Sequence, residues 1–208
     1  MIQLENMTKV IKKQTVLDDI NIKFENGKIY GLYGPNGSGK TMILRTLAGL
    51  VIPTKGNVIV DGKVLHREIS FPPSVGIIIE NMELLPHLTA YENLKELARI
   101  KQVSDESDIV NSLQRVGLTS EKKVKNYSLG MKQRLNVAQA IFEKPELILL
   151  DEPMNALDEE GIERVYKILK EEKKRGACII MATHNKRDFD EICDETIKVN
   201  NGRLEDVK

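Results

Sequence analysis

The sequence predicts an α/β protein with a mainly parallel β-sheet. Residues 147–151 and 177–184 are almost continuously apolar, which is typical of strands that are buried on both faces of a sheet. Segments with helical periodicity alternate with these runs, and a glycine-rich stretch at residues 34–41 follows a strand-like segment. Together these observations indicate parallel strands joined by helices, with both faces of the sheet covered.

The first part of the chain is predicted to form β-structure. Apolar and polar residues alternate over residues 20–24, and residues 28–34 form a strand-like run that leads into the glycine-rich stretch. Asp61 and Gly62 stand between two apolar runs, which is a β-hairpin signal, and residues 75–79 are a short apolar strand. We therefore expect an N-terminal antiparallel β subdomain.

Residues 88–142 show a helical pattern. Thr89 and Glu92 have the spacing of a capping box, in which each side chain accepts a hydrogen bond from the backbone of the other residue at the start of a helix. A second helix is expected at residues 108–116, and a third from Met131 to Phe142.

This helical pattern interrupts the alternation of strands and helices, so an inserted α-helical subdomain is expected at about residues 84–142. The periodic residues between Ile162 and Leu169 then predict a helix that ends at Gly176, because glycine readily adopts the left-handed conformation of a helix C-terminus. The whole chain, residues 1–208, is expected to form one domain.

The composition is that of a globular protein, with 41% apolar and 30% charged residues. Lysine plus arginine equals aspartate plus glutamate, at 31 each, so we expect no nucleic-acid partner that needs a wholly basic surface. The longest apolar runs are far shorter than the ~20 residues that cross a bilayer. The first residues, MIQLENMTK, lack the pattern of a secretion signal, and Cys178 and Cys193 form no CxxC pair, which favours reduced structural cysteines in the cytosol.

Residues 34–41, GPNGSGKT, match the phosphate-binding pattern GxxxxGK[ST]. Glycines let several backbone N–H groups point at phosphate oxygens, and the helix expected at residues 41–50 adds its positive N-terminal end. Lys40 would place a charge on the β- and γ-phosphates, and the Thr41 hydroxyl can bind Mg²⁺. The residues expected to bind nucleotide here are Gly34, Pro35, Asn36, Gly37, Ser38, Gly39, Lys40, Thr41 and Met42. The alternative is a merely flexible turn, which the flanking strand and helix disfavour.

The run LILLDEP, residues 147–153, is an apolar strand that ends in two carboxylates. Asp151 could hold Mg²⁺ through water, and Glu152 could accept a proton from an attacking water. The alternative is an acidic pair that caps the next turn. The phosphate-binding pattern earlier in the chain favours the catalytic interpretation.

Read together, GPNGSGKT, YSLGMKQR at 127–134, LILLDEP, NALD at 155–158 and ATH at 182–184 resemble an ATP-binding cassette, the nucleotide-binding subunit of ABC transporters. The resemblance covers nearly the whole chain in the right order. It implies the fold of a P-loop NTPase, with ATP and Mg²⁺ as cofactors and ATP hydrolysis coupled to transport as the activity.

The resemblance also assigns roles by position. Ser128 and Gly130 would contact the γ-phosphate that a second copy of the subunit binds, and Asp158 would lie at the dimer interface. His184 would hydrogen-bond the γ-phosphate and help to place the water. Simpler roles remain open: Ser128 and Asp158 could each cap the helix that follows, and His184 could be an ordinary histidine at a strand end.

Three features of the sequence depart from the family pattern. The early loop has Ile11 where the family has an aromatic residue that stacks on adenine, so weaker contact with the base is expected. Glu80 stands where the family has glutamine; we expect it to contact the metal and to couple to the membrane partner, or else to be a carboxylate that never reaches the site. The signature carries Leu129 and Met131 in place of glycine and glutamine.

Glu80 and YSLGMKQR are most similar to the branch that serves lantibiotic immunity and bacitracin-type resistance exporters. The implied protein is a homodimer, or a pair with a paralogous cassette, bound to a separate transmembrane permease at the cytoplasmic face of the membrane. The implied cargo is an antimicrobial peptide or another amphipathic drug. The alternatives are a soluble ABC ATPase without a transport role and a regulatory nucleotide-binding module.

Overall fold

The computed structural model describes residues 1–80, 83–119 and 121–207, whose strands form an antiparallel sheet and a mainly parallel sheet. The antiparallel sheet has the order β2-β1-β4-β5, and the other sheet has the order β10-β9-β3-β8-β7-β6. The first sheet contains β1 (Ile2–Ile11), β2 (Gln14–Phe24), β4 (Lys55–Val60) and β5 (Lys63–Val64). The second contains β3 (Ile29–Tyr33), β6 (Val75–Ile78), β7 (Leu147–Asp151), β8 (Cys178–Ala182), β9 (Glu195–Asn200) and β10 (Arg203–Val207).

The predicted α/β class with a mainly parallel sheet is confirmed. Strands β6, β7, β8, β3 and β9 run parallel to their neighbours, and β10 alone among the described strands of this sheet pairs antiparallel. The expected antiparallel N-terminal strands and the hairpin at Asp61-Gly62, between β4 and β5, are also present.

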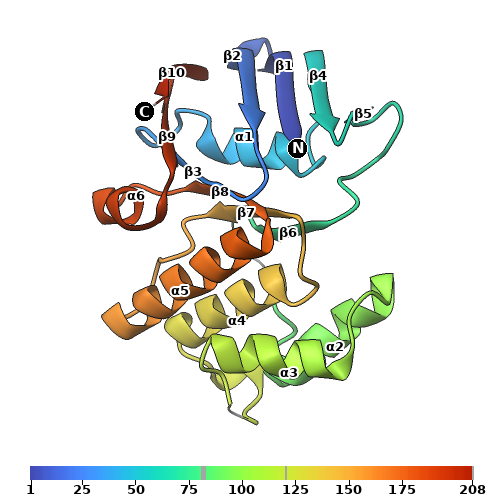
Figure 1. Cartoon of the computed structure of the whole chain (residues 1–208), viewed down its shortest axis with the longest axis vertical. Helices are drawn as coiled ribbons and strands as arrows, with labels where there is room; N and C mark the ends of the chain where they lie inside the picture. Colours follow the sequence, from blue (N-terminus) through green and yellow to red (C-terminus); the bar gives the residue numbers. More distant parts are fainter. Residues whose placement is uncertain (81–82, 120, 208) are drawn as a thin grey trace.

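The parallel sheet is buried on both faces, which explains its apolar runs. Along β7, Ile148 and Leu150 pack into one hydrophobic cluster, whereas Leu147 and Leu149 pack into another on the opposite face. The first cluster is covered by the helices α2 (Ala90–Lys101), α3 (Glu106–Arg115), α4 (Leu129–Ile141) and α5 (Glu159–Arg175). The second is covered by α1 (Lys40–Leu47) and the antiparallel sheet (Figure 1).

Helix ends follow the sequence signals, with two shifts in position. Thr89 and Glu92 form the expected capping box, and Gly176 ends α5 in the left-handed region with φ 104°. The helix predicted at residues 108–116 begins earlier, because Asp105 caps it through the Asp108 N–H.

The first helix, predicted at residues 41–50, covers Lys40–Leu47. The chain turns at Gly49, which has φ 75°, a conformation that glycine adopts without steric cost. The helix therefore stops before the end of its apolar pattern.

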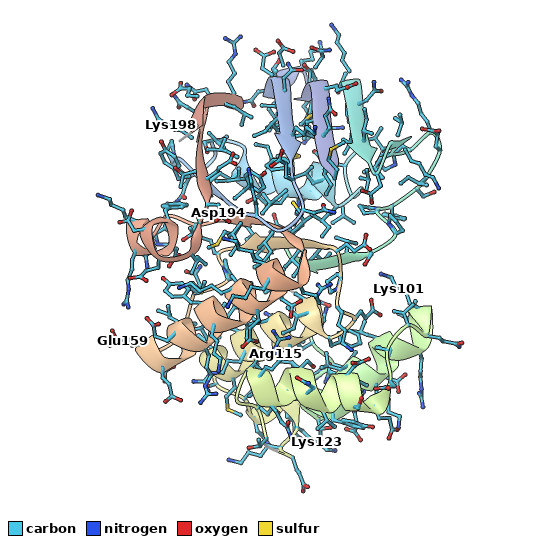
Figure 2. The ribbon with its side chains drawn as sticks, in the orientation of Figure 1. Lys101, Arg115, Lys123, Glu159, Asp194 and Lys198 are labelled. Atoms are coloured by element: carbon cyan, nitrogen blue, oxygen red, sulfur yellow. The ribbon has the colours of Figure 1, made fainter. Side chains whose placement is uncertain are left out.

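An ionic cluster around the buried Glu172 joins α3 to α5. The guanidinium of Arg115, which is labelled in Figure 2, donates to Glu172 at 2.6 Å and to Glu171 at 3.0 Å, and the Glu172 side chain is only 4% exposed. Arg175 donates to the other Glu172 oxygen at 2.7 Å. The helices at the lower end of the molecule in Figure 1 are thus tied to the helix that covers the parallel sheet.

Both cysteines are free, as expected. Within the described ranges, none of the helices combines the length and the apolar character that a bilayer crossing needs.

Candidate nucleotide site

The glycine-rich loop leaves the carboxyl end of β3 and leads into α1. Strand β3 pairs in parallel with β8, which pairs in parallel with β7, so Ala182 and Asp151 end their strands at the same edge of the sheet. Ligands of open parallel sheets bind at this edge. The fold thereby brings together three segments that are separate in the sequence: residues 34–41, 151–152 and 182–184.

Two glycines of the loop occupy positions that favour glycine. A Cβ at Gly34, whose φ is 152°, would lie 2.0 Å from the Val199 carbonyl oxygen. A Cβ at Gly39, whose φ is 113°, would lie 2.8 Å from the Leu17 side chain. The close approach of the β9 backbone therefore requires glycine at position 34, and the left-handed φ favours glycine at position 39.

The start of α1 is open to an anion. Gly39 caps the helix without a side-chain hydrogen bond, and the first turn contains no acidic residue. The N–H groups of a first helical turn have no partners within the helix, so they can bind phosphate oxygens. Lys40 is 8% exposed, and its ammonium donates to the carbonyl oxygens of Gly34 at 2.7 Å and Pro35 at 3.1 Å. The loop thus surrounds a buried positive charge.

The Ser38 hydroxyl also fits a phosphate ligand. Ser38 is 3% exposed, and its Oγ is a buried polar atom without a hydrogen-bond partner. Such atoms are costly unless a ligand or water satisfies them. The Ser38 carbonyl accepts from the Gly202 N–H at 2.8 Å, so the turn between β9 and β10 holds the loop from outside.

Thr41 and Asp151 form a pair of oxygen ligands. The Thr41 hydroxyl donates to Asp151 Oδ2 at 2.6 Å, although the two residues lie 110 positions apart in sequence. Hydroxyl and carboxylate oxygens next to a phosphate site suit Mg²⁺, which prefers a few oxygen ligands from protein together with phosphate and water. The residues present therefore fit the metal that the sequence predicts.

Glu152 and His184 lie in contact beside this pair. His184 Nδ1 is 2.9 Å from each carboxylate oxygen of Glu152, and the Glu152 N–H donates to the Ala182 carbonyl at 2.8 Å. Glu152 has φ 49°, a left-handed conformation that costs of order 1 kcal/mol. The regular strand β7 ends at Asp151, and in this backbone conformation the Glu152 carboxylate contacts His184.

The hydrogen bond from His184 to Glu152, together with the negative charge of Glu152, raises the pKa of His184 above its ordinary value of 6.5. Because the charged imidazole is favoured by this contact, the interaction is strongest at low pH and weakens as pH rises through the raised pKa. We expect Glu152→Gln to lower the His184 pKa. An NMR titration of the three histidines measures it, with His66 and His87 as internal controls; an unchanged His184 pKa would contradict the contact.

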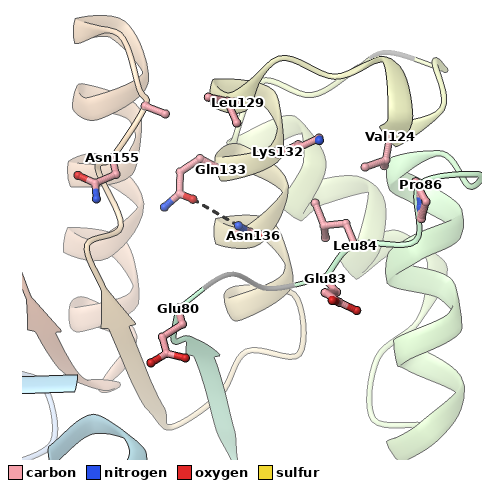
Figure 3. A pocket seen from close by; sticks show the side chains of 11 residues that line it. Glu80, Glu83, Leu84, Pro86, Val124, Leu129, Lys132, Gln133, Asn136 and Asn155 are labelled. Atoms are coloured by element: carbon pink, nitrogen blue, oxygen red, sulfur yellow. Dashed lines mark hydrogen bonds between the residues drawn. The ribbon is translucent and has the colours of Figure 1, made fainter. Parts of the chain in front are cut away.

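Glu80 follows β6 and pairs with Arg45 of α1. Strand β6 is the neighbour of β7, with Ile78 opposite Leu150, so Glu80 leaves the sheet at the same edge as Asp151. Glu80 has φ 58°, and its side chain is 55% exposed at the end of a groove beside α4 (Figure 3). In this structure the Glu80 carboxylate binds the Arg45 guanidinium.

The signature residues and Asp158 lie at the starts of the helices α4 and α5. Ser128 caps α4 by accepting from the Met131 N–H at 3.2 Å, and Asp158 caps α5 by accepting from the Gly161 N–H at 3.0 Å. The hydrogen bond from the Gly161 N–H lowers the pKa of Asp158, and the positive charge of Arg134 lowers it further.

A Cβ at Gly130 would lie 2.9 Å from the Ala156 carbonyl, so the signature lies directly against residues 155–158. Among the described residues, no hydrogen bond or ion pair joins Ser128, Gly130 or Asp158 to the phosphate loop. The simpler capping roles of Ser128 and Asp158 are therefore present.

The early loop lacks an exposed aromatic side chain. Ile11 ends β1 and is 39% exposed, and the turn that follows consists of Lys12 and Lys13, both with positive φ. Phe24, the first aromatic residue in the chain, is buried against Tyr30 in an edge-to-face contact. A base that lies beside this loop would meet an aliphatic surface.

Sequence reasoning did not identify Arg45, Gly202 or Asp188. The Asn201-Gly202 pair is a hairpin signal that could have located the β9–β10 turn, but not its contact with Ser38. Nothing in the local sequence shows that Arg45 meets Glu80 or that Asp188 is buried, because both contacts depend on tertiary packing.

A phosphate loop at the end of β3, oxygen ligands on α1 and β7 and a carboxylate–histidine pair define a P-loop nucleotide-binding protein. A protein-family profile described as ABC transporter matches residues 17–155. The chain belongs to this family, as an ATP-binding and ATP-hydrolysing subunit of a transporter.

Related proteins match along nearly the whole chain. The uncharacterized ABC transporter ATP-binding protein YybJ of Bacillus subtilis is 57% identical over 99% of this chain and 95% of its own length. The lantibiotic transport ATP-binding protein SrtF of Streptococcus pyogenes is 38% identical over 93% of this chain and 84% of its own. The bacitracin transport ATP-binding protein BcrA of Enterococcus faecalis is 39% identical over 98% of this chain and 68% of its own length.

A solved structure, the dimeric structure of the bacterial ABC transporter cassette MJ0796, superposes with a TM-score of 0.90 at 25% identity. The match covers 100% of this chain and 98% of that one. The relation to that cassette extends along the whole chain and includes the helices α2, α3 and α4.

Proposed function

We propose that two copies of this chain, or this chain and a paralogous cassette, enclose two ATP molecules and drive an exporter through their hydrolysis. The observation that carries this proposal is that, among the described residues, Ser128, Gly130 and Asp158 form no hydrogen bond or ion pair with the phosphate loop of their own chain. A head-to-tail pair would bring the Ser128 segment of one copy to the Lys40 loop of the other. The higher affinity of ATP for the closed pair then supplies the work of transport.

Within each site, the residues act on the triphosphate in distinct ways. Residues 34–42 would bind the phosphates, with Lys40 on the β- and γ-groups. Thr41 and Asp151 would hold Mg²⁺, which supplies positive charge to the phosphates when bound. Glu152 accepts a proton from the attacking water, and His184 holds the γ-phosphate and helps to orient that water.

A separate membrane subunit would dock in the groove beside α4 (Figure 3). The groove has a volume of about 550 Å³ and lies between the sheet and the helical subdomain that we propose for residues 84–142. Its lining combines apolar residues, such as Leu84 and Leu129, with polar ones. Asn136 Oδ1 is a buried acceptor there without a partner. A segment of the permease that carries an apolar residue and a hydrogen-bond donor fits these features and would keep the subunit at the cytoplasmic face of the membrane.

We further propose that the cargo is an antimicrobial peptide or a similar amphipathic drug. The relatives SrtF and BcrA are a lantibiotic transport and a bacitracin transport ATP-binding protein, which supports this choice. Deletion of the gene should increase sensitivity to bacitracin or a lantibiotic. A gene copy with Glu152→Gln should not restore resistance, whereas one with Glu191→Gln, an exposed glutamate on α6, should. Unchanged sensitivity to both drug classes would reject this cargo.

The aliphatic early loop leads to a prediction on base selectivity. Stacking of a base on an aromatic residue is worth about 1–3 kcal/mol, and Ile11 cannot supply it. We expect similar dissociation constants for Mg-ATP and Mg-GTP, measured by calorimetry on Glu152→Gln. The variant Ile11→Tyr should bind both nucleotides more tightly. A strong ATP preference in the parent chain would contradict this expectation.

For Glu80 we expect a role in turnover. Glu80 follows β6 at the same edge of the sheet as Asp151, and its ion pair with Arg45 links it to α1, the helix that carries Thr41. Glu80→Ala should lower the ATPase rate about tenfold, the order that a misplaced ligand group costs. Glu83→Ala, which changes an exposed carboxylate of the same groove, is the matched control. Equal rates in both variants would show that Glu80 never reaches the site.

A further inference from the structure

Asp188 of α6 (Lys186–Ile192) is a buried carboxylate to which the roles above assign no function. The residue is 0% exposed. Burial of a carboxylate is costly unless hydrogen bonds satisfy it. The Tyr166 hydroxyl donates to Asp188 Oδ1 at 2.6 Å, and the Thr183 hydroxyl donates to Oδ2 at 2.6 Å. The chain therefore maintains a buried acidic group with one donor from α5 and one from the end of β8.

These donors lie next to the catalytic histidine. Thr183 is itself buried, directly precedes His184, and its hydroxyl also accepts from the Asn185 N–H at 3.1 Å. The Asp188 N–H donates to the Asn185 carbonyl at 3.2 Å. The Thr183 hydroxyl therefore links the residues on both sides of His184, Thr183 and Asn185, to the Asp188 carboxylate.

The His184 ring has little support of its own. Its side chain is 69% exposed, and its described hydrogen bond is the one to Glu152. An exposed ring without packing takes its position from the backbone beneath it. The segment that carries His184 is in turn anchored to the buried Asp188, and Tyr166 holds Asp188 from the opposite side.

We propose that Asp188 is a positioning residue for His184, acting through the Thr183 hydroxyl. The proposal rests on the function assigned to His184 above and names the buried group that sets its place. The network Tyr166–Asp188–Thr183 holds the turn at residues 183–185, so that the imidazole meets Glu152 and the γ-phosphate. Removal of the network leaves the phosphate loop intact and displaces only the histidine.

The test compares two variants that break the network in different ways with one matched control. Asp188→Asn removes the charge at nearly constant volume, and Thr183→Val removes the hydroxyl with its shape retained. Asp190→Asn makes the same change on the same helix at an exposed position. Thermal unfolding shows whether each variant is folded, and Thr183→Val continues the test if Asp188→Asn does not fold.

Two readouts separate a positioning role from a merely structural one. The first is the NMR signal of the His184 ring, with His66 and His87 as references. The second is a comparison of two effects of each variant: its effect on kcat for ATP and its effect on the dissociation constant for Mg-ADP. We expect both network variants to move the His184 signal and to lower kcat about tenfold or more, the scale of a small misplacement at a reacting centre. The Mg-ADP constant should change less than about twofold, and Asp190→Asn should match the parent chain.

The proposal is overturned if folded Asp188→Asn and Thr183→Val keep the parent kcat, or if the His184 signal stays in place in both. A parent chain that fails to hydrolyse ATP would reject the proposed function instead. In that case the NMR readout alone still decides whether Asp188 sets the position of His184.

Discussion

Replacement of Glu152 by glutamine is expected to lower ATP turnover by about 100-fold or more, with nucleotide binding retained. Glutamine has the shape of glutamate but cannot accept the proton of the attacking water, and general bases contribute about 10²–10⁴-fold to rates. The Glu152 carboxylate is placed for this role by its left-handed backbone conformation and by His184 at 2.9 Å. A steady-state phosphate-release assay at saturating Mg-ATP measures the effect.

Glu191→Gln is the control, because it makes the same chemical change at an exposed position on α6. It should keep the parent rate. The loss of a general base should leave at most about a hundredth of the parent rate. If Glu152→Gln kept more than about a tenth of that rate, Glu152 would not be the group that takes the proton.

Replacement of Lys40 by methionine is expected to weaken the binding of Mg-ADP about 30-fold. A hydrogen bond to a charged group contributes about 2 kcal/mol, which corresponds to this factor in the dissociation constant. Lys40 is 8% exposed and held inside the loop by the carbonyls of Gly34 and Pro35, so its charge cannot be replaced by a mobile surface lysine. Methionine keeps most of the length of the side chain and removes only the charge.

The matched control is Lys170→Met, at an exposed position on α5. Calorimetry with Mg-ADP avoids hydrolysis during the measurement. Equal affinities in the Lys40 and Lys170 variants would mean that the loop amides bind the phosphates without the ammonium group, contrary to the role assigned to Lys40.

Local signals predicted much of the fold. Strand β7 was recognised because it is apolar on both faces, and α2 and α5 were bounded by the Thr89 capping box and by Gly176. The segment α6–β9–β10 was not predicted in detail: α6 has only 7 residues, and β9, next to the edge strand β10, mixes charged and apolar side chains. Short elements of this kind take their structure from their neighbours more than from their own pattern.

For the site, motifs that carry their own chemistry were sufficient to select candidates. The loop at residues 34–41 and the pair Asp151-Glu152 were chosen from residue types and spacing, and the fold places them at one edge of the sheet. Other contacts around the site were not predictable, because Arg45 meets Glu80 and Tyr166 meets Asp188 only through tertiary packing. Local sequence indicates which groups can react, whereas packing decides what holds them.

The central claim is that one chain holds only half of each ATP site. Light scattering after gel filtration of the Glu152→Gln variant, with and without saturating Mg-ATP, tests it most directly. The account predicts the chain mass of 23.5 kDa without nucleotide and twice that mass with it, and loss of the pairing in a double variant that also carries Ser128→Glu. A single-chain mass under saturating Mg-ATP would contradict the account.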